Sequence, residues 1–160
     1  MPKVVTHVST DVREILFQNV YSQRCHHMAA VKSNGGSGTA REITFQNFTG
    51  HGNMHAIKLD ALYKNAPVAP GDGVEFDYIT WSNWAGSTVD GTMPPSIQLH
   101  CLPTTLCGSL LVEDYNIGTE TGTQELYECR NSYGMGACMN PFAGNGAYTT
   151  TQTVKTFAAE

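Results

Sequence analysis

The sequence predicts an all-β protein that folds as a solenoid of parallel strands, a parallel β-helix. Three observations support this fold class. Only 14% of the 160 residues are charged, 16 are glycine, and polar turn-forming residues are common. This composition is typical of short strands joined by tight turns rather than of a helical bundle. Short apolar strings also recur along the chain, and within them apolar and polar residues alternate with the period of a half-buried strand.

The first recurring string, Ile-Leu-Phe-Gln-Asn-Val, sets the register of the repeats. It returns with changes along the chain, at 15–20, 43–48, 79–84 and, more loosely, 110–115. Second short strands are expected between these strings, at 30–33, 56–59, 96–99 and 125–128. A unit of about 30 residues with two or three short strands cannot bury its apolar face alone, so we expect about four to five stacked coils. A β-sandwich with coincidentally similar strands is the alternative.

An asparagine recurs in the same place in the strings. The positions are Asn19, Asn47 and Asn83, with Asp114 in the fourth string. Because they follow the inward apolar residues by even steps, we expect these side chains to point into the core or its corner and to hydrogen-bond from coil to coil. Asn47 also begins the one N-glycosylation sequence, Asn-Phe-Thr. If it is inward, it is buried and unmodified.

No composition shift marks a domain boundary, so a single β-helix domain over 1–160 is expected. Two stretches rich in proline and glycine, 64–72 and 85–95, are expected to leave the solenoid as loops on one side. The tail at 143–160 is rich in glycine, threonine and alanine, which suits a loosely packed end or an edge strand.

Charge and hydropathy exclude some classes of partner. The formal net charge of −5 argues against electrostatic binding of nucleic acid. No apolar run approaches the roughly 20 residues that a membrane helix needs, so no membrane association is expected. The first residues also lack the apolar stretch and cleavage site of a signal peptide.

The spacing of the five cysteines favours disulfides. Cys101 and Cys107 flank one short loop, and Cys129 and Cys138 flank another that is rich in glycine. Two disulfides that each close a short loop are typical of a secreted protein. A metal site is the competing interpretation, but the spacing typical of zinc ligands is absent. Cys25 is left over, either with a partner elsewhere or as a free thiol.

The histidines do not predict a metal site. His26 and His27 are the one adjacent pair, and adjacent residues of a strand face opposite ways. We therefore expect neither a bound metal nor another cofactor.

Three strings resemble a known family. They lie at 31–39, 50–53 and 125–130, and the first contains Lys-Ser-Asn-Gly-Gly-Ser-Gly-Thr. They are similar to those of fungal rhamnogalacturonan hydrolases, which are pectinases of the polygalacturonase type. The resemblance runs over about residues 10–153, with both cysteine pairs in the expected places. It implies a right-handed parallel β-helix, secretion, no metal, and hydrolysis of pectic polysaccharide with inversion at the anomeric carbon.

The family's catalytic carboxylates have no counterpart here. They belong to an Asn-Xaa-Asp motif and an Asp-Asp pair that precede the lysine strand, whereas only Asp11 and Glu14 precede Lys32, and no Asp-Asp occurs. We therefore expect a C-terminal portion of such an enzyme, truncated at its N-terminal side, with no catalytic residue and no activity alone. His51, between Gly50 and Gly52, resembles the catalytic histidine motif but follows the lysine strand, so a structural turn is expected.

Four residues are the candidates for substrate binding. Polygalacturonases carry Arg-Ile-Lys on the cleft face, and the run ending at Lys32 keeps the lysine but not the arginine. Tyr63 resembles the family's cleft tyrosine, and Lys58 and Asp60 alternate outward on a neighbouring strand. The plainer alternatives are a solvated lysine and a packing tyrosine.

Three functions remain open at this point. The chain is part of a secreted pectinase, a noncatalytic pectin-binding module, or a structural β-helix fragment. The expected partner is pectic polysaccharide. End-to-end self-association through an open end of the solenoid is the other interaction considered.

Overall fold

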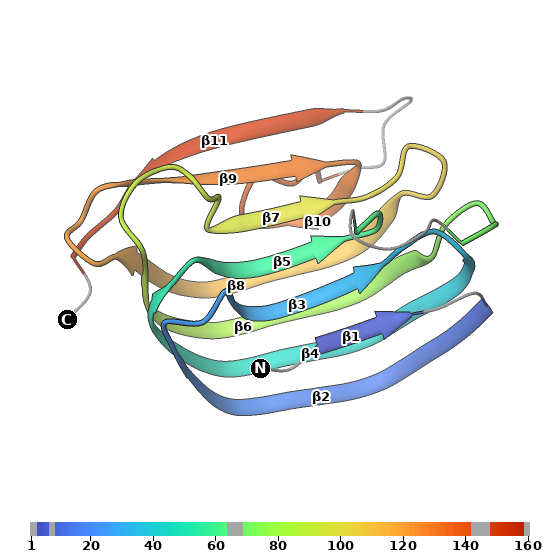
Figure 1. The fold of residues 1–160 in the computed structure, drawn as a ribbon, viewed down its shortest axis with the longest axis horizontal. Helices are drawn as coiled ribbons and strands as arrows, with labels where there is room; N and C mark the ends of the chain where they lie inside the picture. The colour runs from blue at the N-terminus through green and yellow to red at the C-terminus, as the bar shows by residue number, and fades with distance from the viewer. Residues whose placement is uncertain (1–2, 7–8, 64–68, 142–147, 159–160) are drawn as a thin grey trace.

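A computed structural model gives the fold of residues 3–6, 9–63, 69–141 and 148–158 (Figure 1). Every regular element in these ranges is a β-strand, as the composition predicts. None of the described residues forms a helix long and apolar enough to span a membrane. Residues 64–68 of the first expected loop and 143–147 and 159–160 of the expected tail lie outside the described residues.

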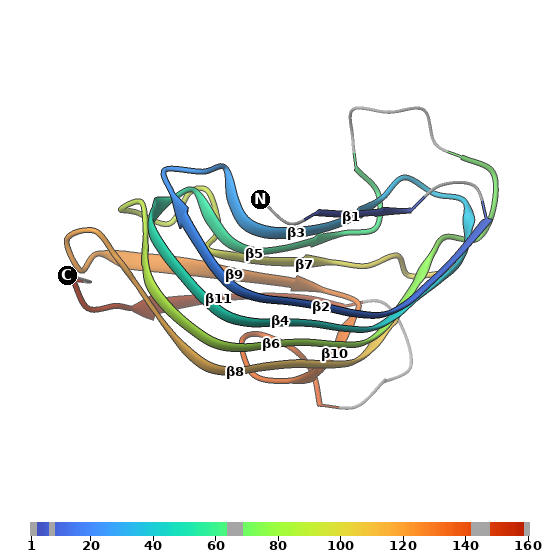
Figure 2. The same cartoon turned by 90° about the horizontal axis from the view of Figure 1, so that it is seen from below.

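The strands of the described residues form two sheets, and the chain passes from one to the other. The odd-numbered sheet contains β1 (Lys3–Thr6), β3 (His27–Ser33), β5 (His55–Asp60), β7 (Ile97–His100), β9 (Gln124–Arg130) and β11 (Thr149–Lys155), in that order. The other sheet contains β2 (Ser9–Gln23), β4 (Ser37–Asn53), β6 (Glu75–Thr88), β8 (Cys107–Thr119) and β10 (Ser132–Met135), in that order. Figure 2 shows the even-numbered strands curving beneath the odd-numbered ones.

Neighbouring strands are parallel throughout, except that β11 runs antiparallel to β9 at the sheet edge. This arrangement is consistent with a β-helix. The sandwich alternative is wrong, because sandwiches pair their strands antiparallel. The recurring strings pair residue by residue, with Ile15 beside Ile43 and Phe45 beside Trp81.

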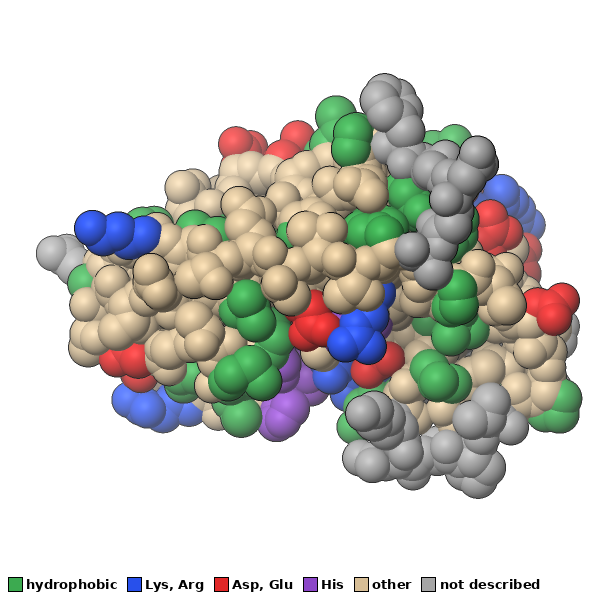
Figure 3. All heavy atoms as spheres, turned by 90° about the horizontal axis from the view of Figure 1, so that it is seen from above, with side chains coloured by type: hydrophobic (Ala, Val, Ile, Leu, Met, Phe, Trp, Pro, Cys, Tyr) green, Lys and Arg blue, Asp and Glu red, His purple; other side chains and the backbone are tan. Residues whose placement is uncertain are grey.

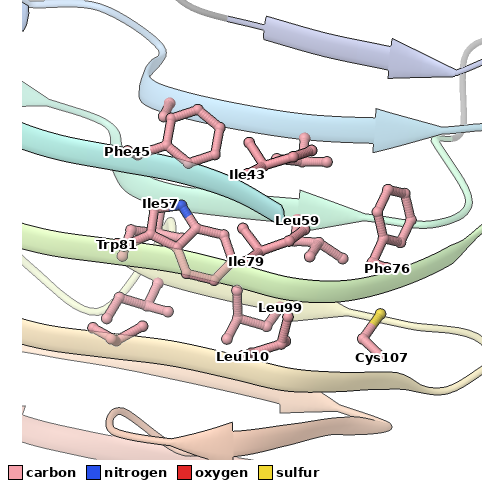
Figure 4. Packing of buried hydrophobic residues seen from close by; sticks show 14 of the residues in the cluster. Ile43, Phe45, Ile57, Leu59, Phe76, Ile79, Trp81, Leu99, Cys107 and Leu110 are labelled. Carbon is pink, nitrogen blue, oxygen red and sulfur yellow. The ribbon is translucent and has the colours of Figure 1, made fainter. Parts of the chain in front are cut away.

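Stacked apolar side chains fill the space between the sheets (Figure 4). The Phe45 and Trp81 rings lie 6.1 Å apart at 7°, and the Phe48 and Trp84 rings lie 4.5 Å apart at 3°. All four are buried. Equivalent residues of successive repeats therefore pack on one another, as the repeats predict.

The asparagine column exists, but its predicted burial is wrong. Asn47 Nδ2 donates to Asn19 Oδ1 at 3.0 Å, and Asn83 Nδ2 donates to Asn47 Oδ1 at 2.7 Å. All three asparagines are exposed and have φ of 56–57°. A residue in the left-handed region bends the strand and breaks its alternation, so that Gln46 and Asn47 both face solvent and the next side chain, Phe48, is buried. The glycosylation sequence at Asn47 is therefore on the surface.

The expected loop at 85–95 begins too early. Residues 85–88 belong to β6 and pair with β8. The glycine taken as a turn signal, Gly86, has φ of 119°, and a Cβ there would collide with the carbonyl oxygen of Gly50 on the neighbouring strand. This glycine permits close strand packing rather than a turn.

The two expected disulfides are formed. Cys101 is bonded to Cys107 with a Cα–Cα distance of 5.8 Å, and Cys129 to Cys138 with 5.6 Å, both within the ordinary range. The first closes the connection from β7 to β8, and the second ties β9 to the turn after β10. Cys25 is a half-buried free thiol.

Candidate functional site

The outer face of the odd-numbered sheet carries rows of charged and polar side chains. Side chains alternate along each short strand, so apolar residues such as Leu59 and Leu99 face the core while their neighbours face out. The parallel register lines up the outward residues. One row is Lys32, Asp60, His100 and Arg130, and the other is Lys58, Gln98 and Glu128.

A groove of about 700 Å³ lies over these rows. Its lining comes from β5, β7 and β9, from His26 and Tyr63, and from the loop at 101–103. Figure 3 shows acidic, basic and histidine side chains gathered on this side of the molecule. The groove is thus lined mainly by polar groups that three neighbouring strands place side by side.

Lys32 lies beneath Tyr63 rather than in open solvent. Its Nζ is 3.8 Å from the centroid of the Tyr63 ring, a cation–π contact, and only 6% of the residue is exposed. Tyr63 lines the groove, and Lys32 does not. The structure therefore excludes a freely solvated lysine and gives Tyr63 a packing contact as well as a place at the groove.

Lys58 and Asp60, the other two predicted residues, both line the groove. They are two apart on β5, so they share a face, and Lys58 Nζ lies 3.7 Å from Asp60 Oδ2. Asp60 Oδ1 also accepts a hydrogen bond from the Leu62 backbone at 3.2 Å. The pair is held in place before any ligand arrives.

Glu128 contacts two basic side chains in the same groove. Its Oε1 is 3.0 Å from His100 Nε2 and 2.7 Å from an Arg130 guanidinium nitrogen. Burial alone would raise the pKa of Glu128, but His100 and Arg130 together lower it. Burial lowers the pKa of His100 despite the opposing effect of Glu128. Glu128 is therefore held as a carboxylate, the opposite of what a general acid requires.

The carboxyl group with a raised pKa lies elsewhere. Burial raises the pKa of Glu125, which is 1% exposed and accepts a hydrogen bond from Tyr127 at 2.8 Å. Glu125 does not line the groove. The acid and base pair of an inverting hydrolase, with carboxyl groups about 6.5–9.5 Å apart and one of raised pKa, is not assembled among the described groove residues.

Three histidines meet beside the groove. The ring centroids of His26 and His27 lie 4.3 Å apart, and those of His27 and His55 lie 4.9 Å apart. The prediction that His26 and His27 face opposite ways is wrong, because His26 precedes β3 and its backbone is not part of the extended strand. Burial, and next the neighbouring His55, lower the pKa of His27 to about 3. Burial lowers the pKa of His55 to about 4, although a hydrogen bond to Pro95 opposes this.

His51 lies apart from that cluster, at the end of β4. Its Nδ1 is 3.4 Å from Ser87 Oγ, and the same hydroxyl accepts a hydrogen bond from the Gly52 backbone at 2.9 Å. Gly52 has φ of 58°. His51 lies within β4 and pairs with Gln23 of β2, so the structure places it in a strand and not in the expected turn.

The sequence analysis missed most of the residues that line the groove. Gln98, His100, Glu128 and Arg130 alternate with the apolar residues of the third and fourth short strands, as Lys58 and Asp60 do on the second. Aligning those strands residue by residue would have placed all of these side chains on one face. The ion pairs among them depend on the register, which the sequence gives only through the repeats.

Comparison with known proteins bears on what this groove is for. No protein-family model matches the sequence. The chain is 41% identical over 145 residues to rhamnogalacturonase A of Aspergillus aculeatus, covering 91% of this chain and 33% of that protein. It is 39% identical over 147 residues to a probable rhamnogalacturonase A of Aspergillus niger, covering 92% and 33% respectively. A probable rhamnogalacturonase B of Aspergillus fumigatus is 35% identical over 144 residues, covering 90% and 28%. The chain thus spans about a third of the length of these relatives.

Proposed function

We propose that this chain supplies part of the substrate-binding groove of a pectin-degrading glycoside hydrolase. Its predicted relationship to the fungal rhamnogalacturonases is confirmed by the sequence comparison. The substrate is a pectic polysaccharide of the rhamnogalacturonan type, cleaved with inversion. The chain corresponds to the C-terminal part of such an enzyme, within a single right-handed β-helix domain of about four to five coils. Secretion fits the two disulfides.

The observation that carries this proposal is the composition of the groove. Lys58 and Arg130 offer cations to the carboxylates of a uronic acid, and Gln98 and the two carboxylates offer partners to sugar hydroxyls. Tyr63 adds an aromatic edge to the groove. Because the side chains are paired with one another in advance, little side-chain ordering opposes binding of the polymer.

We further propose that the chain alone does not hydrolyse the polymer. Asp60 is paired with Lys58, and Glu128 is held ionised by His100 and Arg130, so neither carboxyl is arranged as a general acid. In this account Lys32 acts through Tyr63, whose ring it supports, rather than by direct contact with the sugar.

Affinity electrophoresis in gels that contain rhamnogalacturonan or polygalacturonate tests the binding proposal. We expect stronger retardation by rhamnogalacturonan and about 3- to 10-fold weaker binding after Arg130→Gln, because a half-exposed charge-assisted contact is lost. Lys155→Gln is the matched control, since it removes a cation from β11 outside the groove. Equal mobility with and without polymer would refute pectin binding, and release of reducing ends would refute the proposed inactivity.

A structural fragment that self-associates is the second candidate, and the edge strand β2 favours it. Leu16 and Tyr21 on this strand are 54% and 65% exposed, and no described strand pairs with its outer edge. An exposed edge with apolar side chains is a template for pairing with another chain. Sedimentation at increasing protein concentration separates the candidates, because the binding proposal alone expects no association.

A further inference from the structure

We propose that His26, His27 and His55 form a binding site for a divalent transition-metal ion such as Zn²⁺. One ring nitrogen from each of the three lies within 4.8 Å of the other two. Imidazole nitrogens are common ligands of zinc, and three of them leave one tetrahedral position open. The sequence predicted no metal here, because the fold and not the spacing brings these rings together.

The distances are close to those of a metal site. Two nitrogens bound to one tetrahedral zinc ion at about 2.0–2.1 Å lie about 3.3 Å apart. His26 Nδ1 is 3.0 Å from His27 Nε2 and 3.2 Å from His27 Nδ1, so this pair is already at ligand spacing. The set closes around an ion if the His55 ring moves by no more than about 1.5 Å.

The backbone fixes the origin of all three side chains. His27 and His55 are register partners at the first positions of β3 and β5, and each is 5% exposed. His26 precedes β3, and its carbonyl accepts a hydrogen bond from the His55 backbone at 3.1 Å. His26 is exposed and lines the groove, so an ion can reach the two buried ligands from that side. Ligands on paired strands are held more firmly than ligands on a loop.

A hydrogen bond outside the cluster orients one ligand. His55 Nδ1 is 2.5 Å from the carbonyl oxygen of Pro95. Because a carbonyl only accepts, Nδ1 carries the proton, which leaves Nε2 with the lone pair that a metal ion would take. Histidine ligands of metals usually have such an acceptor behind them.

The charges around the cluster set the expected strength. Burial lowers the pKa of both His27 and His55, which favours the neutral imidazole that ligates a metal. Lys32 and Lys58 face the same rings and would repel a cation, although Lys58 is paired with Asp60. We therefore expect weaker binding than at a structural zinc site of four protein ligands.

Isothermal titration of the tag-free 160-residue chain with ZnCl₂ tests the proposal. We expect one ion per chain, and at least about 10-fold weaker binding after His26→Gln, since loss of a ligand costs at least as much as loss of its supporting partner. His26 is exposed, so this variant is expected to fold, which far-ultraviolet circular dichroism checks. His51→Gln is the matched control, and Cys25→Ser removes the one free thiol among the described residues. Both should bind as the parent does.

Cobalt substitution gives a second readout on the unaltered chain. Co²⁺ in the site should show the intense visible absorption of tetrahedral coordination, and saturating Zn²⁺ should raise the melting temperature, because the ion links β3 to β5 only in the folded state. Unchanged affinity in His26→Gln would overturn the proposal, as would loss of binding in Cys25→Ser or a cobalt spectrum of the hexa-aqua type. These tests use no polysaccharide, so their outcome is independent of the proposed function.

Discussion

Lys32 and Tyr63 illustrate how single residues depart from their sequence interpretation. A lysine on the outer face of a strand is expected in solvent, yet the Tyr63 ring covers its ammonium group at 3.8 Å. The contact stabilises the cation and fixes the ring at the groove. No pattern in the sequence reports this contact, because residue 63 follows β5 rather than β3 and reaches Lys32 through the strand pairing.

Glu125 gives a prediction at the same scale. Burial raises the pKa of Glu125 in the folded protein above its pKa in the unfolded chain, so the folded state binds the proton more tightly. As pH rises above the pKa in the unfolded chain, the ionised carboxylate therefore destabilises the fold. Glu125→Gln keeps an oxygen that can accept from Tyr127 and removes the charge. We expect the variant to be more stable than the parent at pH 7 and equal to it near pH 3, as measured by urea unfolding.

The exposed carboxylate of Glu113 supplies the control for that series. Glu113→Gln should leave the difference between pH 3 and pH 7 close to that of the parent, because this side chain is on the surface. The buried-charge explanation would be contradicted if Glu125→Gln were less stable than the parent at pH 7 and its stability changed between pH 3 and pH 7 as that of the parent does.

At the scale of elements, the long strands of the even-numbered sheet are set by two bends each. The bends fall at non-glycine residues with positive φ, at Glu14, Glu42, Tyr78 and Ser109, and again at Asn19, Asn47, Asn83 and Asp114. The asparagines signalled the second bend in the sequence. The first bend is formed by three different residue types, glutamate, tyrosine and serine, so no recurring residue in the sequence marks it. Simple alternation consequently placed the strands correctly but assigned the wrong side to the asparagine column.

The second bend can be tested at Asn47. Asn47→Ala places alanine, whose Cβ is strained at positive φ and which has no polar side chain, in the left-handed region. The change also removes both hydrogen bonds that Asn47 makes in the column. We therefore expect the free energy of unfolding to fall by about 1 kcal/mol. Asn47→Gly should cost less, because glycine adopts this φ freely. Gln46→Ala, at an exposed neighbour, is the control. Equal losses in the alanine and glycine variants would mean that the backbone bend contributes nothing.

At the scale of the whole molecule, the groove is a product of stacking. The four polar positions that the sequence analysis missed come from β7 and β9, and they lie beside Lys58 and Asp60 because β5, β7 and β9 pair in one parallel register. The repeats were enough to predict an all-β fold with parallel strands and stacked inward apolar residues, and the spacing of the cysteines was enough to predict both disulfides. They were not enough to predict the ion pairs or the histidine cluster, which depend on side-chain conformations and on the backbone just before β3.

Chemical-shift mapping of the isotopically labelled chain with rhamnogalacturonan oligosaccharides tests whether the groove binds pectin. We expect perturbations that saturate with added oligosaccharide at β5, β7 and β9 and at Tyr63, which line the groove. The outer face of β4 and β6 should remain unchanged. Perturbations confined to the even-numbered sheet, or none at all at saturating oligosaccharide, would contradict the assignment of this groove as a pectin-binding site.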